Sequence, residues 1–233
     1  MACLLMLLFL APDPTPQSQV PEVVQFLKDE KPDKALALLR EIGTHKKNHE
    51  EAGDLIKLVR SSRPKRPPEV DEAIFLALRD IGSRKVTSKL IALFKHRTLK
   101  KDPRARAGIC LALGGAADPR AVDALCDRMR DPDDHVIAAA IEASGAYRYA
   151  KESIRKELFE TVLGVYVPTW NMKESINPDH KTQRQRAERK WEVVAKPSEK
   201  TLRLLSNTTQ EDPPAWRRWW NKKKKAKWAE IEN

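Results

Sequence analysis

Apolar and small residues recur at intervals of three and four in the middle of the chain, between residues 102 and 145. In the first part of this stretch the recurring positions are Ala105, Gly108, Ile109, Ala112 and Leu113. The next part repeats the spacing at Val122, Leu125, Cys126 and Met129. Such spacing is typical of amphipathic α-helices that bury one face. It predicts two short helices packed face to face as a hairpin, followed by the first helix of another hairpin.

Asp-Pro pairs mark where these helices begin. The three pairs are Asp102–Pro103, Asp118–Pro119 and Asp131–Pro132. Proline suits the first helical turn because its missing N–H would have no partner there, and the preceding carboxylate can accept a hydrogen bond from a free N–H. We therefore expect each aspartate to cap a helix. We also expect the pair Gly114–Gly115 to end the first helix, because glycine adopts positive φ easily.

The same pattern recurs along residues 20–164 with a variable period. The segment LREIG at residues 39–43 returns as LRDIG at residues 78–82, which is 39 residues later. Ala77-Leu78 returns as Ala112-Leu113 after 35 residues, and a related pattern returns at residues 143–145 after 31 more. Helical hairpins joined by loops of different length produce such periods. We expect about four hairpins, stacked so that neighbours share one continuous core.

These capped hairpins resemble a HEAT repeat, in particular the short bacterial kind also seen in phycobilisome-lyase-like repeats. The resemblance implies an all-α fold, an α-solenoid whose curved surface binds other proteins. Some HEAT-like proteins are enzymes, notably DNA glycosylases and chromophore lyases. No catalytic residue of either family can be placed on this sequence, so we expect neither enzymatic activity nor a cofactor.

The composition agrees with an all-α fold and adds a strong positive charge. The chain of 233 residues has 41% hydrophobic residues, 16 prolines and few aromatic residues, which favours helices with marked starts over sheet. Its formal net charge is +11, and the stretch from residue 164 to 233 holds 16 Lys/Arg against 9 Asp/Glu, a net +7. A basic surface favours anionic partners such as nucleic acid or an anionic envelope polymer.

The regular pattern stops after Gly164, and we divide the chain there into a repeat domain (20–164) and a C-terminal segment (165–233). Residues 165–180 contain two prolines and no sustained period, so we expect an irregular connector. A polar helix is expected over residues 180–195. Ser198 is then expected to cap a short separate helix.

The end of the chain combines tryptophans with basic residues. The candidate residues of this tail are Trp216, Trp219, Trp220, Arg217, Arg218, Lys222, Lys223, Lys224 and Lys225. The three tryptophans share one helix face, so we favour a cap that closes the open end of the solenoid. The alternative is a platform that stacks bases of single-stranded nucleic acid. The segment from Leu202 to Lys225 also resembles the ending of exported bacterial HEAT-repeat proteins of unassigned function.

Residues 1–19 resemble a signal peptide followed by a proline-rich linker. The apolar run at residues 2–11 has the length of a signal-peptide core and is too short to span a bilayer. We therefore expect export to the periplasm or cell envelope, with no transmembrane span in the mature chain. In the alternative, the run is an N-terminal helix packed on the first repeat of a cytoplasmic protein.

Three further groups of residues have side chains that could form a disulfide or bind a metal ion. Cys110 and Cys126 would lie on the two helices of one hairpin, and we favour buried thiols over a disulfide. His45 and His49 have the spacing of paired metal ligands on a helix, but no third ligand is evident and we expect a solvated helix. The acidic run Asp131, Asp133 and Asp134 lacks the glycine and terminal glutamate of a calcium loop, so we expect a capped turn.

Two functions from different classes remain. The favoured one is a non-catalytic scaffold, exported to the envelope, that binds an unidentified protein partner. The alternative is a cytoplasmic nucleic-acid-binding protein that follows the phosphate backbone with its basic loops and lysine run.

Overall fold

The computed structural model describes residues 18–61, 66–175, 181–229 and 231, and all regular secondary structure in these ranges is helical. The α-helices are α1 (Val20–Lys28), α2 (Pro32–Ile42), α3 (His49–Ser61), α4 (Pro68–Ile81), α5 (Thr87–Leu93), α6 (Pro103–Ala116), α7 (Val122–Arg128), α8 (Asp134–Ser144), α9 (Glu152–Ser175), α10 (Lys181–Ser206) and α11 (Pro213–Lys223). Short 3-10 turns are η2 (Arg84–Val86), η3 (Leu99–Lys101), η4 (Pro119–Ala121) and η5 (Gly145–Tyr149).

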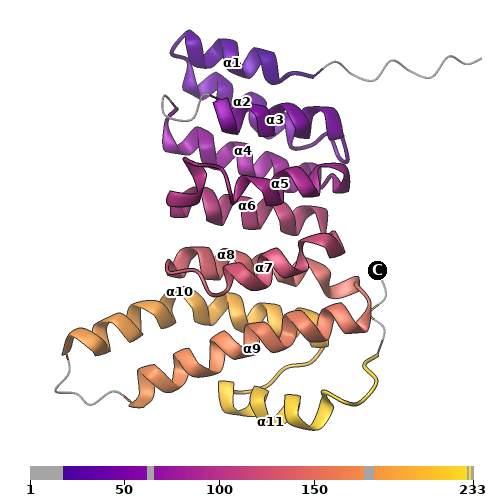
Figure 1. The fold of residues 1–233 in the computed structure, drawn as a ribbon, viewed down its shortest axis with the longest axis vertical. Helices are drawn as coiled ribbons and strands as arrows, with labels where there is room; N and C mark the ends of the chain where they lie inside the picture. Colours follow the sequence, from indigo (N-terminus) through magenta and orange to yellow (C-terminus); the bar gives the residue numbers. More distant parts are fainter. Residues whose placement is uncertain (1–17, 62–65, 176–180, 230, 232–233) are drawn as a thin grey trace, which may run out of the picture.

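The helices stack across the long axis of the molecule in two layers (Figure 1). In one layer α2, α4, α6, α8 and α10 pack on one another in succession, and α3, α5, α7 and α9 form the second layer. Helix α1 packs on α2 and α3 at one end, and α11 packs on α9 at the other. The fold is therefore an α-solenoid, as predicted. The expected hairpins correspond to α2/α3, α4/α5, α6/α7 and α8/α9, but the layers pack mainly through α3 with α4, α5 with α6 and α7 with α8, rather than within each expected hairpin.

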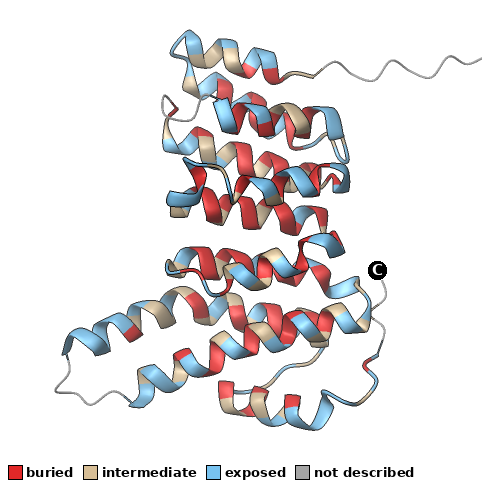
Figure 2. Ribbon diagram, viewed as in Figure 1, coloured by how far each residue is buried: buried red, intermediate tan, exposed pale blue. Residues whose placement is uncertain are grey.

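The core is continuous between the two layers, where buried residues line the facing sides of the helices (Figure 2). The positions predicted to face inward in the central hairpin are buried, with Cys126 half-buried at the edge. Cys110 is fully buried, and both thiols are free, as expected. Because each hairpin exposes apolar faces on both sides, stacking is what removes them from water.

Two of the three predicted aspartates are caps. Asp102 caps α6, and Asp118 caps the 3-10 turn η4 that leads into α7. Asp102 accepts a hydrogen bond from the Ala105 N–H at 3.2 Å, and Asp118 accepts one from the Arg120 N–H at 3.0 Å. The third prediction was wrong, because α8 begins two residues later and is capped by Asp133. The carboxylate of Asp131 is instead committed to a buried ion pair described below, so it is not available to that helix end.

The Gly114–Gly115 pair does not end α6, which is a correction of the prediction. The helix continues to Ala116, and Ala117 takes the left-handed conformation with φ of 42°. The glycines serve packing instead. A Cβ on Gly114 would lie 2.7 Å from the Cα of Ala143 in α8, and one on Gly115 would overlap the backbone of Arg79 in α4. Because neither position carries a side chain, α6 can approach α8 and α4 closely.

The expected irregular connector is also wrong for residues 165–175, and its remaining residues, 176–180, lie outside the described part of the chain. Helix α9 continues through Pro168 to Ser175, and α10 runs unbroken through Pro197, so Ser198 is a buried residue inside a helix and caps nothing. Pro168 is exposed, as is Gly164, whose carbonyl loses its helical partner and faces water. Packing of α9 on α10 and α11 offsets the cost of an interior proline, about 3 kcal/mol in an isolated helix.

Helices α9 and α10 project beyond the stack as an arm (Figure 1). They have 24 and 26 residues against at most 14 in the other α-helices. At about 1.5 Å per residue, the difference leaves an overhang of roughly 15 Å. We define the arm as residues 171–175 of α9 and 181–190 of α10. The predicted leader, residues 1–17, lies outside the described residues. Among those that are described, no helix combines the length and the apolar character that crossing a bilayer requires.

Candidate functional site: a groove across three repeats

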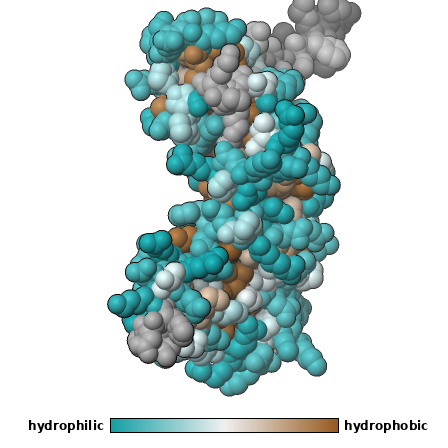
Figure 3. Space-filling model, turned by 60° about the vertical axis from the view of Figure 1, so that its left-hand side comes forward, coloured by the Kyte–Doolittle hydropathy of each residue, from teal (hydrophilic) through white to brown (hydrophobic). Residues whose placement is uncertain are grey.

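A groove of about 960 Å³ crosses the N-terminal halves of α4, α6 and α8, in three successive repeats. Figure 3 shows apolar surface between hydrophilic side chains on the side of the molecule where these helices begin. The floor is apolar and includes Leu76 of α4 with Ala107 and Leu111 of α6, all half-buried. Partly exposed apolar atoms in a concave surface are typical of binding sites in proteins.

Close contact between α4 and α6 shapes this floor. Phe75 lies against Gly108, where any Cβ would overlap its ring. The ring is only 3% exposed, yet it forms part of the groove wall. The absence of a side chain at residue 108 therefore sets both the depth of the groove and the separation of the two helices.

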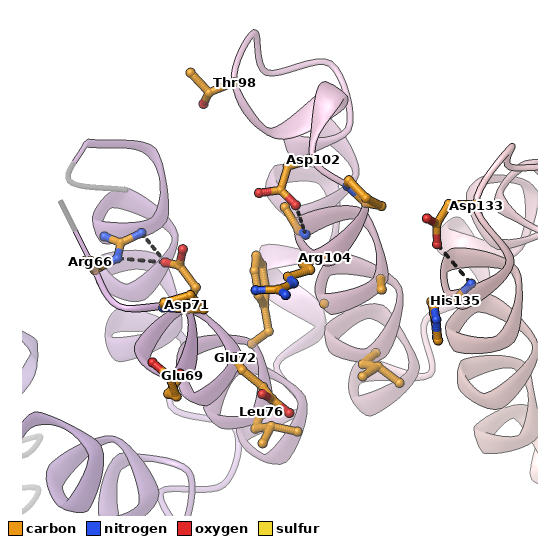
Figure 4. A pocket seen from close by; sticks show the side chains of 17 residues that line it. Arg66, Glu69, Asp71, Glu72, Leu76, Thr98, Asp102, Arg104, Asp133 and His135 are labelled. Atoms are coloured by element: carbon orange, nitrogen blue, oxygen red, sulfur yellow. Dashed lines mark hydrogen bonds and ion pairs between the residues drawn. The ribbon is translucent and has the colours of Figure 1, made fainter. Parts of the chain in front are cut away.

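A buried ion pair stabilises the side of the groove where α4 begins. The Nε of Arg66 donates to Asp71 Oδ1 at 2.8 Å (Figure 4). Its Nη1 donates to the carbonyl of Leu58 at 2.5 Å. Arg66 thus ties the start of α4 to the end of α3. Because its guanidinium is buried and bonded within the protein, it adds little positive charge to the open groove.

A second buried ion pair joins the loops that carry the groove residues Asp102 and Asp133, although neither member of the pair lines the groove. Arg106 binds Asp131 through two hydrogen bonds, Nε to Oδ2 at 2.8 Å and Nη2 to Oδ1 at 2.7 Å. Its Nη1 donates to the carbonyl of Lys100 at 2.9 Å, so the loops before α6 and α8 are joined. These hydrogen bonds raise the pKa of the Arg106 guanidinium further above its usual value. The groove is therefore formed before any partner binds.

The groove is acidic, although the chain as a whole is basic. It is lined by five carboxylates and two arginines. Asp102 and Asp133 cap helices, and Asp71 pairs with Arg66. Glu69 and Glu72, both on α4, are exposed, and neither forms an ion pair or a hydrogen bond through its side chain with another described residue. Two carboxylates one turn apart are thus free to meet a positively charged partner.

Figure 4 also places Arg104 and His135 at the groove, on α6 and α8 respectively. Both are exposed. Arg104 lies between α4 and α6, so it is the cation that a partner meets in the open part of the groove. The surface therefore carries more negative than positive charge without being uniformly acidic.

The described residues contain no cluster of three or more His, Cys, Asp or Glu that could hold a metal ion. His45 and His49 do not share a helix, which corrects the expected geometry. His45 lies in the loop before α3, where its Nδ1 is 2.8 Å from Oε2 of the buried Glu51. Asn48 donates to the same carboxylate at 3.0 Å, so this histidine has a structural partner.

The tryptophans predicted from the tail pack around Phe159 of α9 rather than at the groove. Trp216 and Trp220 are buried and Trp219 is half-buried. Their ring centroids lie 5.8, 5.1 and 5.3 Å from that of Phe159, in the order 216, 220 and 219. Tilted and edge-to-face contacts of this kind are favourable between aromatic rings. The buried rings are not available to stack on bases.

Trp228 completes this cluster and was missed in the sequence. Its ring is 5.4 Å from that of Phe159 and is 6% exposed. Arg155, buried in α9, stacks on it at 5.4 Å and donates to the carbonyls of Leu205 at 2.8 Å and Ala229 at 2.9 Å. Burial lowers the pKa of this arginine. The available signal was the position of Trp228, eight residues after Trp220 on the far side of the lysine run.

The basic residues of the tail stay on the surface. Arg217 is half-buried and its Nη2 is 3.5 Å from the carbonyl of Leu163. Arg218 and the four lysines from 222 to 225 are exposed. They lie on and after α11, at the end of the solenoid, and none lines the groove.

The architecture defines the class of protein as an α-solenoid of stacked helical hairpins. Residues 96–156 match the family model of HEAT repeats, and this stretch contains α6, α7 and α8, including two of the three helices that form the groove. The finding supports a HEAT-repeat protein. No curated protein and no solved structure matches the chain.

Proposed function

We propose that this protein is a non-catalytic HEAT-repeat scaffold that binds a protein partner along the groove of α4, α6 and α8. HEAT repeats commonly serve protein interaction, which is the general part of this proposal. The observation that carries the rest is the preformed groove itself. Its apolar floor lies on α4 and α6, polar residues at the start of α8 complete it, and buried Arg–Asp pairs fix the adjoining helix starts. A preformed surface loses little conformational entropy on binding, so more of the contact energy appears as affinity.

The tail supports the cap interpretation rather than a binding role for the tryptophans. The rings are packed within the protein, and the lysines form a solvated face beside them. We further propose that the chain is exported to the cell envelope, on the basis of the apolar run at residues 2–11.

Cross-linking from the groove tests the binding role. A photoreactive amino acid replaces Leu111 on the floor, and in a control it replaces Lys57, which lies on α3 with 78% of its side chain exposed. We expect a discrete adduct from residue 111 and none from residue 57. Equal adducts from both positions, or none from residue 111, would contradict the proposed site.

Fractionation with a C-terminal tag tests the location. We expect the tagged chain in the envelope or periplasmic fraction, with the leader removed. Recovery of the full-length protein from the cytosol, with residues 1–11 retained, would refute export without affecting the groove.

A further inference from the structure

The arm of α9 and α10 is a basic helical projection with few contacts of its own. Residues 181–190 hold five Lys/Arg and one Glu, a net +4, and Ala187 is the one residue among them that is buried. Arg184 pairs with Glu188 at 2.9 Å. Arg186 and Arg189 are exposed one turn apart, and neither forms an ion pair with another described residue. A helix that is polar on all sides either bridges to another body or depends on several i,i+4 ion pairs, and the described residues 181–190 contain one such pair.

The arm also presents an apolar side chain. Met172, near its end, is 48% exposed. Among the described residues only Tyr149 is a comparably exposed large apolar side chain. Methionine adapts its shape to irregular apolar surfaces and is common at binding interfaces. The arm therefore combines one adaptable apolar group with free arginines.

The groove offers the complementary chemistry. Glu69 and Glu72 are exposed and one turn apart, beside the half-buried apolar floor at Leu76 and Leu111. Arm and groove also adjoin in the same chain, since Lys190 of the arm is 3.7 Å from Asp134 at the start of α8. Figure 1 shows the arm projecting on the side where α4 and α8 begin.

We propose that the groove binds the arm of a second copy of this chain, so that the protein forms a two-fold symmetric dimer. This inference rests on the proposed function, because it names one protein partner for the same groove. An arm cannot enter its own groove, since α9 and α10 are continuous helices that hold it pointing away from the stack. In a two-fold arrangement the arm–groove contact is made twice.

Because the contact is made twice, each arm–groove surface needs to bury less area. A stable interface buries roughly 1,600 Å² in total, so each arm–groove contact would supply about half of it. The net charge of +11 does not prevent association, because salt screens charges beyond about 8 Å at physiological ionic strength. In the proposed dimer, the ion pairs of Arg186 and Arg189 with Glu69 and Glu72 would be direct and would fall within that range.

Charge reversal tests the contact directly. One variant carries Glu69→Lys and Glu72→Lys in the groove, and another carries Arg186→Glu and Arg189→Glu in the arm. Sedimentation velocity at protein concentrations from about 1 to 100 μM shows the dimer fraction. We expect each variant to raise the dimer Kd at least about tenfold. The variant with all four substitutions should dimerise again, because both contacts regain opposite charges.

A matched control carries Glu22→Lys and Glu160→Lys, which add the same charge at exposed positions away from the groove. It should dimerise like the wild type, and circular dichroism should show all variants folded. A monomeric wild type overturns the proposal, as does a dimer indifferent to both reversals or a folded four-site variant that stays monomeric. If the Leu111 cross-link then captures a different protein, the proposed function stands and the second copy is excluded.

Discussion

Arg106 and Asp131 face each other as a buried bidentate ion pair, with distances of 2.8 and 2.7 Å, and join the loop before α6 to the loop before α8. The two residues are 25 positions apart in the sequence. Asp131 also accepts a hydrogen bond from the Asp133 N–H at 3.1 Å, which places Asp133 where it caps α8. One ion pair thus fixes the start of a helix and, through Asp133, the position of a residue that lines the groove.

Removing the charge of Asp131 should be costly. Asp131→Asn leaves the Arg106 guanidinium buried without its counterion, and we expect unfolding free energy to fall by about 3 kcal/mol. Urea unfolding followed by circular dichroism measures the loss. Glu199→Gln is the control, because it removes an exposed pair with Arg203 and should cost less than about 1 kcal/mol. Similar losses in the two variants would contradict a special role for the buried pair.

The close approach at Gly108 should not tolerate a methyl group. Gly108→Ala forces Phe75 to move, and we expect destabilisation by about 1–3 kcal/mol. Gly53→Ala is a matched control within α3, because no atom lies within 4 Å of its would-be Cβ. That substitution should stabilise by about 0.5–1 kcal/mol, since alanine is the better helix former. The melting temperatures of both variants test this prediction. Shifts of the same sign in the two variants would argue against a close contact between Phe75 and Gly108.

Truncating the tryptophans tests the cap. Trp216→Ala empties a fully buried site beside Phe159, and we expect a loss of about 3–5 kcal/mol. Trp219→Ala should cost less because its ring is half-buried. Replacing the lysines 222–225 with glutamine should leave the melting temperature nearly unchanged. An unchanged melting temperature for Trp216→Ala would refute the cap.

The low pKa of Asp118 predicts that part of the folding stability is lost at acidic pH. Hydrogen bonds from the Arg120 side chain, opposed by burial, lower the pKa of Asp118 to about 2 in the folded protein. In the unfolded chain this pKa is about 3.9, so the stabilisation is complete above about pH 4 and disappears as the pH falls toward 2. Because Arg120 is 57% exposed, we expect at most about 2 kcal/mol.

The measurement compares wild type with Asp118→Asn in urea at several pH values. The stability difference should be largest near neutral pH and should shrink between about pH 4 and pH 2. Asp123→Asn, at an exposed position, provides the control. A difference that stays constant down to pH 2 would show that the carboxylate charge does not contribute.

Nucleic-acid binding is the alternative function, and fluorescence polarisation with labelled DNA and RNA tests it. Under the scaffold proposal we expect no binding at about 50 mM salt and micromolar protein. The alternative instead predicts binding that weakens roughly a thousandfold between about 50 and 200 mM salt, if about six phosphates are neutralised. That result would assign a role to the arm and to the lysine run.

The groove could not have been located from the sequence. Its charged residues belong to three different repeats, and each has a local explanation, since acidic residues in a first helical turn also stabilise the helix. Glu69 looks like such a residue when α4 is considered alone. Its second role becomes visible only when α6 brings Arg104 and Leu111 beside it. The tail, by contrast, was predicted as a candidate site because its tryptophans and lysines stand out in the sequence, yet most of those rings are buried.

By itself the sequence determined the α-solenoid, because helix caps and apolar spacing act over a few residues and recur in each hairpin. Tertiary structure alone decided where α8 begins, how far α9 continues past Pro168 and where the groove lies. Each of these depends on a partner distant in the chain: Arg106 for Asp131, α10 for α9 and Phe75 for Gly108. Packing energies of that kind exceed local preferences, so no local pattern reveals them.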